Sequence, residues 1–283
     1  MSPMTSPEFP TVSGPIMIDG PVGPLEASVD LPEGDVTPLP LVVVLCNPLS
    51  TEGGSMHNKV VTMAARSLRE LGATTVRFNF RSVGESAGNF DHGNGERDDL
   101  LAVVAWVSEQ RPRDDLWLAG FSFGAYVSLR AAHAVQPEGL ISIAPPVGRS
   151  WSFDDIALPA VPWLLIQGEA DEIVDANAVF EWVATLARPP MVVKMPDTSH
   201  FFHRKLIDLR GAVKHGVRDW LPAPPAACAT ARGLFLALFG CCGLTHLLRT
   251  GCLRSARNPP ELSAVGCATS CTFTTLQAAR PFT

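Results

Sequence analysis

The chain has 283 residues, of which 46% are hydrophobic and 18% are charged. This composition allows a sizeable buried core and excludes a largely disordered chain. The formal net charge of −6 argues against a nucleic-acid-binding surface, which would need a basic stripe. The sequence contains neither a G-x-x-x-x-G-K-[ST] phosphate loop nor a C-x-x-C pair, so nucleotide binding and a structural zinc site have little support.

The C-terminal part differs from the rest of the chain. Residues 222–283 hold five arginines, one glutamate and six of the seven cysteines. Because this tail carries +4 and the whole chain −6, residues 1–221 carry −10. A lone Cys46 in that main part is typical of a reducing compartment without disulfides. We therefore expect a flexible N-terminus over residues 1–13, one α/β domain over residues 14–221, and an atypical, dispensable tail over residues 222–283.

No segment resembles a targeting or membrane signal. Met1–Pro15 is rich in proline and serine and lacks the basic start and apolar run of a secretory signal. Gly233–Leu248, the most apolar stretch, is short for a bilayer span and contains His246. We expect a cytoplasmic protein that binds neither a membrane nor nucleic acid.

Hydrophobic patterning predicts alternating strands and helices. A hairpin of Ile16–Asp19 and Leu25–Leu31 comes first, and Leu41–Cys46 is a continuous apolar run, as in strands buried on both faces. The later strands are predicted at Thr74–Phe80, Leu116–Phe121, Leu140–Ala144, Val161–Gln167 and Met191–Met195. The helices are predicted at Asn58–Leu71, Glu96–Glu109, Phe123–Ala134, Ala176–Ala187 and His203–Leu221. This alternation predicts an α/β fold with a mostly parallel sheet and helices on both faces.

The motif G-x-S-x-G occurs twice, at Gly84–Gly88 and at Gly120–Gly124. In a nucleophile elbow, the serine lies on a strained turn between a strand and a helix, whose N-terminus offers backbone N–H groups to an oxyanion. Ser122 fits, because a predicted strand ends directly before it and a predicted helix begins directly after it. Ser86 does not fit, because it is separated from its strand and followed by Asn89–Gly95, which cannot start a helix. We interpret Ser122 as a nucleophile and Ser86 as a loop serine.

An acid and a histidine should follow such a nucleophile, in that order and at strand ends. Asp171 comes just after the next-to-last predicted strand, with Glu169 and Asp175 as rivals. Asp175 lies at a predicted helix N-cap, which is a sufficient structural reason for it. His200 follows the last predicted strand, whereas His203 lies at the start of the last predicted helix, where a capping or packing role suffices. We expect Asp171 and His200 to complete the site.

The oxyanion hole needs two backbone donors. One is the N–H of Phe123, directly after the nucleophile. The other should come from the loop after the strand Leu41–Cys46, where the N–H of Leu49 is the best candidate. Side chains are nearly irrelevant to this role, so the assignment of Leu49 follows from its position in the loop.

At this point the chain resembles a bacterial family of small, lidless α/β-hydrolases, several of which are esterases. The resemblance covers residues 14–221. It is carried by five segments: Gly53–Val61, Val76–Arg81, Gly120–Tyr126, Ala144–Gly148 and Ser199–His203. The family usually has His-Pro-His-Pro where this chain has Asn47–Ser50. We expect this difference to affect substrate preference more than catalysis, because the backbone donor is retained.

The triad and the resemblance together imply a carboxylesterase that acts on small-molecule esters through an acyl-enzyme, without a metal or an organic cofactor. A thioesterase or a small-peptide hydrolase is an alternative, since the same triad serves those leaving groups. A non-catalytic binding protein of the same fold is another. Only Pro145–Pro162 separates the predicted strand Leu140–Ala144 from the core of the predicted strand Val161–Gln167. This segment is far too short to hold an inserted cap. We therefore expect no cap domain and an open cleft walled by Leu49, Phe123 and the loops near Phe90 and Phe201.

Overall fold

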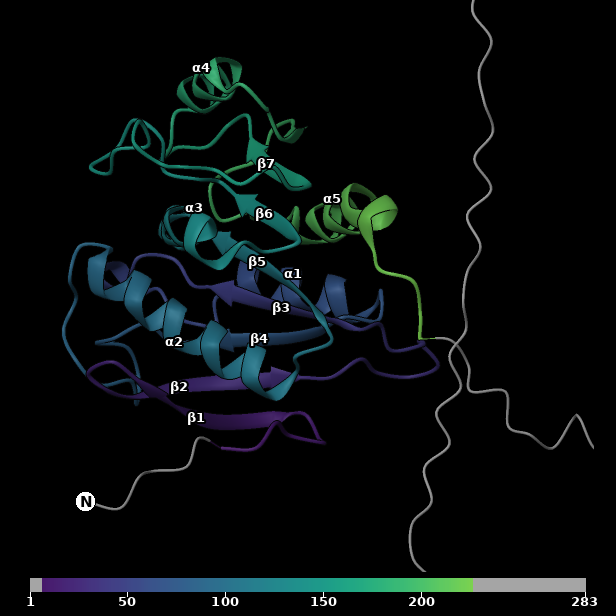
Figure 1. Cartoon of the computed structure of the whole chain (residues 1–283). Helices are drawn as coiled ribbons and strands as arrows, with labels where there is room; N and C mark the ends of the chain where they lie inside the picture. The colour runs from purple at the N-terminus through teal and green to yellow at the C-terminus, as the bar shows by residue number, and fades with distance from the viewer. Residues whose placement is uncertain (1–6, 226–283) are drawn as a thin grey trace, which may run out of the picture. The chain divides into compact units, whose positions relative to one another are not determined.

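The computed structural model describes residues 7–225, in which eight strands form one sheet. Its order is β1-β2-β4-β3-β5-β6-β7-β8, which Figure 1 shows from bottom to top as far as β7. β1 and β2 form the antiparallel hairpin, β2 pairs antiparallel with β4, and all later neighbours are parallel. The strands are β1 (Gly14–Gly20), β2 (Gly23–Asp30), β3 (Leu41–Cys46), β4 (Thr74–Phe78), β5 (Asp115–Phe121), β6 (Gly139–Ile143), β7 (Trp163–Gly168) and β8 (Met191–Met195). The predicted mostly parallel α/β sheet is confirmed.

The helices cover both faces of the sheet, as predicted. They are α1 (Lys59–Arg69), α2 (Asn94–Gln110), α3 (Phe123–Val135), α4 (Ala176–Thr185) and α5 (Leu206–Val217). Helices α2, α3 and α4 bury apolar side chains in one core cluster, and α1 and α5 bury theirs in a second cluster on the opposite face. All six residues of β3 are buried, as expected for a strand between two layers of helices.

Several predicted boundaries shift by one to four residues, among them the start of the last helix and the end of β4. The last helix was expected from His203 but begins at Leu206, because Phe202 and Arg204 have φ of 54° and 59°, which an α-helix does not accommodate. β4 ends at Phe78 instead of Phe80. The next residue is Asn79, whose backbone N–H still donates to the Glu26 carbonyl at 2.8 Å. Its side chain accepts the N–H of Met56 at 2.7 Å and donates to the Glu26 carboxylate at 2.8 Å.

The two chain ends were predicted to lie outside the folded domain. Of the N-terminal segment, Pro7 accepts a hydrogen bond from the Trp106 indole at 2.7 Å, and Phe9 stacks on that indole with ring centroids 5.3 Å apart. The tail assigned to residues 222–283 falls outside the described residues apart from 222–225, and its dispensability stays a prediction.

Within residues 7–225, no helix is long and apolar enough to cross a membrane.

An ion-pair network fastens α5 to α1 on one face of the sheet. Glu70 follows the last residue of α1 and accepts hydrogen bonds from Arg210 at 2.7 Å and from Lys214 at 3.0 Å, both on α5. Arg66 adds a contact to the same carboxylate at 3.2 Å. Burial raises the pKa of Glu70, but the hydrogen bonds from Arg210 and Lys214 outweigh this effect and lower the pKa to about 2.

We predict that the substitution Glu70→Gln destabilises the fold at neutral pH and does so progressively less as the pH falls towards 2. The folded-state pKa lies below the ordinary value of 4.5, so the ionised carboxylate stabilises the fold above that pH, and this contribution is lost as the pH falls towards 2. Because the cations are partly exposed, we expect about 1 kcal/mol at pH 7. Urea unfolding at pH 7 and pH 3 measures it. Glu33→Gln, in a surface pair with Arg69, is the matched control, and an equal loss for both variants at pH 7 would contradict the prediction.

Candidate active site

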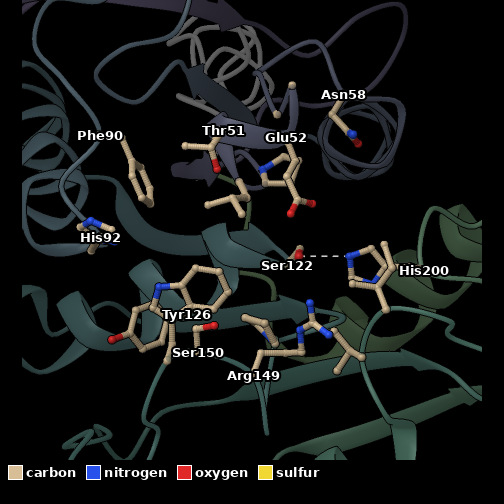
Figure 2. A pocket seen from close by; sticks show the side chains of 18 of the residues that line it. Thr51, Glu52, Asn58, Phe90, His92, Ser122, Tyr126, Arg149, Ser150 and His200 are labelled. Carbon is tan, nitrogen blue, oxygen red and sulfur yellow. Dashed lines mark hydrogen bonds between the residues drawn. The ribbon is translucent and has the colours of Figure 1, made fainter.

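Three side chains from distant parts of the chain meet at the carboxyl edge of the sheet. Ser122 follows β5, Asp171 follows β7 and His200 follows β8. The Ser122 Oγ lies 3.0 Å from the His200 Nε2, the contact drawn in Figure 2. The His200 Nδ1 lies 2.8 Å from the Asp171 Oδ2. With the imidazole proton on Nδ1, where it donates a hydrogen bond to Asp171, Nε2 has a lone pair that can accept the hydroxyl proton of Ser122.

Asp171 is held by more than the histidine. Its side chain is fully buried, and its Oδ1 accepts the backbone N–H groups of Ile173 at 2.9 Å and Val174 at 2.8 Å. Burial raises the pKa of Asp171, but the hydrogen bonds from His200 and from these two N–H groups outweigh that effect, so the pKa lies below its ordinary value. The carboxylate is therefore ionised at neutral pH, and it can stabilise an imidazolium at His200.

The backbone at Ser122 is strained, with φ of 53° and ψ of −119°. The turn fits only because glycines flank it. A Cβ at Gly120 would lie 2.3 Å from the backbone of Gly124, and a Cβ at Gly124 would lie 2.4 Å from the carbonyl oxygen of Cys46. The serine N–H donates to the Ile143 carbonyl at 2.8 Å, which anchors the turn to β6. This is the strand–turn–helix geometry that projects a serine hydroxyl above a sheet.

The two expected oxyanion donors are available. Within residues 7–225, the backbone N–H groups of Leu49 and Phe123 have no hydrogen-bond acceptor, as a pair of donors awaiting an oxyanion requires. The loop that carries Leu49 is fixed by Asn47, whose buried side chain donates to the Pro48 carbonyl at 2.8 Å and accepts the N–H of Phe80 at 3.2 Å. Asn47 thus ties the donor loop to the residues after β4.

The rival residues lie elsewhere. Glu169 is exposed. Asp175 caps α4 by accepting the N–H of Asn177 at 2.9 Å, as its sequence position indicated. His203 is exposed in the turn before α5, and its backbone N–H contacts the Ser199 hydroxyl at 3.4 Å.

Ser86, the serine of the second motif, is buried with its hydroxyl fully engaged. It accepts the N–H of Glu26 at 2.9 Å and donates to the Asn79 carbonyl at 2.8 Å. These bonds fasten the loop after β4 to β2 and leave the oxygen in no position to attack a substrate.

A cleft of about 560 Å³ opens above Ser122. Leu49, Phe90 and Phe201 line it, as expected. The expectation that Phe123 forms part of the wall is wrong, because its ring is fully buried against Phe80, Phe90 and Trp151. Tyr126 and Trp151 supply the aromatic wall instead. Figure 2 shows Phe90, His92 and Tyr126 on one side of Ser122, and Asn58 and His200 on the other.

Comparison with known proteins agrees with this geometry. The sequence matches the family described as "Alpha/beta hydrolase domain" over residues 51–210. The chain belongs to the α/β-hydrolase family. A crystal structure from Xanthomonas campestris, described as an α/β serine hydrolase without a lid, is 70% identical with a TM-score of 0.76 and covers 78% of this chain and 100% of its own. The structure of an α/β serine hydrolase homologue from Coxiella burnetii is 43% identical with a TM-score of 0.71, and it covers 74% of this chain and 100% of its own. An uncharacterized protein of Rickettsia prowazekii is 32% identical, covering 70% of this chain and 86% of its own.

The segment between β6 and β7 of this α/β hydrolase is short, as the few residues between the two predicted strands indicated. It forms no cap domain. Its residues Arg149 to Ser152 instead line one side of the cleft. The α/β-hydrolase fold without a cap is therefore confirmed.

Three residues that support the site of this hydrolase had no distinctive sequence signal. Asn47 fixes the donor loop, as described above. Gln167, the buried penultimate residue of β7, donates to the Asp171 Oδ2 at 3.0 Å. Glu172 accepts the backbone N–H of His200 at 3.0 Å. A polar residue inside the apolar run Val161–Gln167 was the one visible hint, since a buried amide needs a partner.

We predict that Ser86→Ala lowers the stability of this hydrolase but leaves its turnover per folded molecule unchanged. The variant leaves the Glu26 N–H and the Asn79 carbonyl without their partner, which costs about 1–3 kcal/mol. Chemical denaturation measures the stability, and initial rates normalised to folded protein measure the turnover. A turnover loss of orders of magnitude with an unchanged fold would contradict this assignment.

Proposed function

We propose that this α/β hydrolase cleaves carboxylic esters, with Ser122 as the nucleophile, His200 as the general base and Asp171 as the residue that orients His200. The observation that carries the proposal is the unbroken chain of contacts from the Ser122 Oγ through the His200 ring to Asp171, at 3.0 Å and 2.8 Å. A serine that lines an open cleft, backed by a buried histidine and a buried aspartate, is suited to acyl transfer.

In the first half-reaction, the Ser122 Oγ attacks the ester carbonyl carbon while the His200 Nε2 accepts the hydroxyl proton. The negative charge that forms on the carbonyl oxygen is stabilised by the N–H groups of Leu49 and Phe123. The tetrahedral intermediate collapses, the bond to the alcohol oxygen breaks, and the imidazolium of His200 donates its proton to that oxygen. The alcohol leaves, and the acyl group stays on Ser122 as an ester.

In the second half-reaction, a water molecule occupies the place of the alcohol. His200 accepts a proton from this water as it attacks the acyl carbon, and the same two N–H groups stabilise the second oxyanion. Collapse releases the carboxylic acid, and Ser122 regains its proton. Throughout, the ionised Asp171 keeps the imidazole in the required orientation and stabilises its charged form.

We predict that Ser122→Ala abolishes hydrolysis of p-nitrophenyl acetate, with a loss on the order of 10⁶-fold, because nucleophile, base and orienting carboxylate act as a unit. A fluorophosphonate probe should label the wild-type protein on Ser122 and should leave the variant unlabelled, as intact-mass and peptide mass spectrometry will show. Ser86→Ala is the matched control and should be labelled like the wild type. A folded wild-type protein that resists the probe and does not turn over the ester would instead be a non-catalytic binding protein.

The open cleft also limits the acyl group. Each CH₂ removed from water contributes about 0.8 kcal/mol, but a cleft without a cap buries little of a long chain. The same openness leaves room for bulky groups on the alcohol. We therefore propose short-chain, soluble esters as substrates, with broad tolerance of the alcohol.

We predict that kcat/KM for p-nitrophenyl esters is highest for short acyl chains and does not rise from butanoate to dodecanoate. The rate should also show no jump when the substrate concentration passes the solubility limit, because there is no lid to open at an interface. Initial rates across the acyl series measure both effects. A marked preference for emulsified long-chain triglycerides over soluble esters would overturn the open-cleft proposal.

A further inference from the structure

A second hollow of about 520 Å³ adjoins the catalytic cleft. The two share Gly53, Asn58 and Phe201 in their lining. One wall of the second hollow is formed by the start of α1 and the loop before it, and the other by the turn between His200 and α5. A substrate that extends past these three shared residues would pass from one space into the other.

The second hollow is basic, although the chain as a whole is acidic. Its lining includes Lys59, Arg204, His57 and His203, and contains no aspartate or glutamate. Within residues 7–225, neither Lys59 nor Arg204 forms a salt bridge. Four nitrogen-bearing residues, two from the start of α1 and the loop before it and two from the turn before α5, thus line one space whose lining holds no carboxylate. Such an arrangement attracts an anion.

The hollow lies on the side of the site where the leaving group departs. The His200 Nε2 must donate its proton to the leaving oxygen, so the leaving group has to lie over the imidazole. Figure 2 shows that His200 and Asn58 lie on the same side of Ser122, whereas Phe90, His92 and Tyr126 lie on the opposite side. Phe201, directly after the catalytic histidine, and Asn58 border both spaces. The aromatic side therefore suits the acyl group, and the basic hollow suits a substituent on the alcohol.

Resting on the proposed ester hydrolysis, we propose that the basic hollow binds a phosphate group carried by the alcohol part of the ester. Two full positive charges match a phosphate monoester, which carries close to two negative charges at neutral pH. Its several oxygens can accept hydrogen bonds from Lys59, Arg204 and the two histidine rings together. A carboxylate has only two oxygens and can accept hydrogen bonds from fewer of these donors. Lys59 is the first residue of α1, so the positive end of the helix dipole adds to the attraction. Water still adds across the same ester bond, and the phosphorylated alcohol leaves with its proton.

A matched set of three synthetic esters tests this proposal. 4-Acetoxyphenyl phosphate carries the phosphate on the leaving group, and 4-methoxyphenyl acetate is its neutral counterpart. Phenyl 3-phosphonopropanoate carries the anion on the acyl side. We expect the lowest KM for 4-acetoxyphenyl phosphate, and we expect this advantage to shrink as NaCl is raised, because the two cations are exposed and screened by salt.

The variants Lys59→Gln and Arg204→Gln locate the effect. Each should reduce the ratio of kcat/KM for the phosphorylated ester to that for the neutral ester by about fivefold, and the double variant by more than either. Arg188→Gln, which removes an exposed cation outside both spaces, is the matched control and should leave the ratio unchanged.

An equal KM for the phosphorylated and neutral esters, or a ratio that the two hollow variants leave unchanged, overturns the proposal. So does an equal preference for the anion on the acyl side. These outcomes are distinct from a failure of the proposed function, in which the wild-type protein would turn over none of the three esters and would resist the fluorophosphonate probe.

Discussion

The close packing of the turn at Ser122 is the constraint on which the rest of the site depends. The serine backbone is held in a strained conformation, and the glycines on either side allow α3 to start within contact distance of β3 and β5. A Cβ at Gly120 would meet the backbone of α3, and a Cβ at Gly124 would meet the backbone at the end of β3, so neither fits without a shift of the helix or of a central strand. The strain is therefore supported by the whole central sheet, which fixes the Ser122 hydroxyl and the Phe123 N–H in the same step. The proposed nucleophile and one proposed oxyanion donor therefore follow from one backbone arrangement.

The parallel sheet extends this arrangement to the other residues. Since β3, β5, β7 and β8 run in one direction, their carboxyl ends present Leu49, Ser122, Asp171 and His200 at one edge. For this reason the sequence sufficed to predict the approach of Ser122, Asp171 and His200: the periodicity located the strand ends, and the topology of α/β sheets brings such ends together. The same reasoning separated Ser122 from Ser86, because only one of the two motifs joins a strand directly to a helix.

Other features could not be predicted because they depend on contacts between residues far apart in the chain. The hydrogen bond from the Phe80 N–H to Asn47 and the contact of Gln167 with Asp171 need the folded geometry. Phe123 was misplaced for a similar reason: its position after the nucleophile indicated the cleft, but the first turn of α3 directs its ring into the core against Phe80. The start of α5 moved from His203 to Leu206 because the left-handed backbone conformations at Phe202 and Arg204 exclude these first residues from the helix.

The absence of a cap changes how such an enzyme can recognise its substrate. A short acyl group of two to four carbons can contribute only about 1.5–3 kcal/mol through burial, even if the cleft removed all of it from water. Each hydrogen bond to a charged group contributes about 1.5–3 kcal/mol, reduced by screening where the cation is exposed. Two such contacts therefore equal or exceed the acyl contribution. In an open cleft, selectivity is accordingly better supplied by fixed charges beside the leaving group than by an apolar acyl pocket. Lys59 and Arg204 line the hollow that adjoins the cleft at Phe201, directly after His200, and in the proposed function a contact made there by the alcohol part also positions the ester oxygen that receives the imidazolium proton.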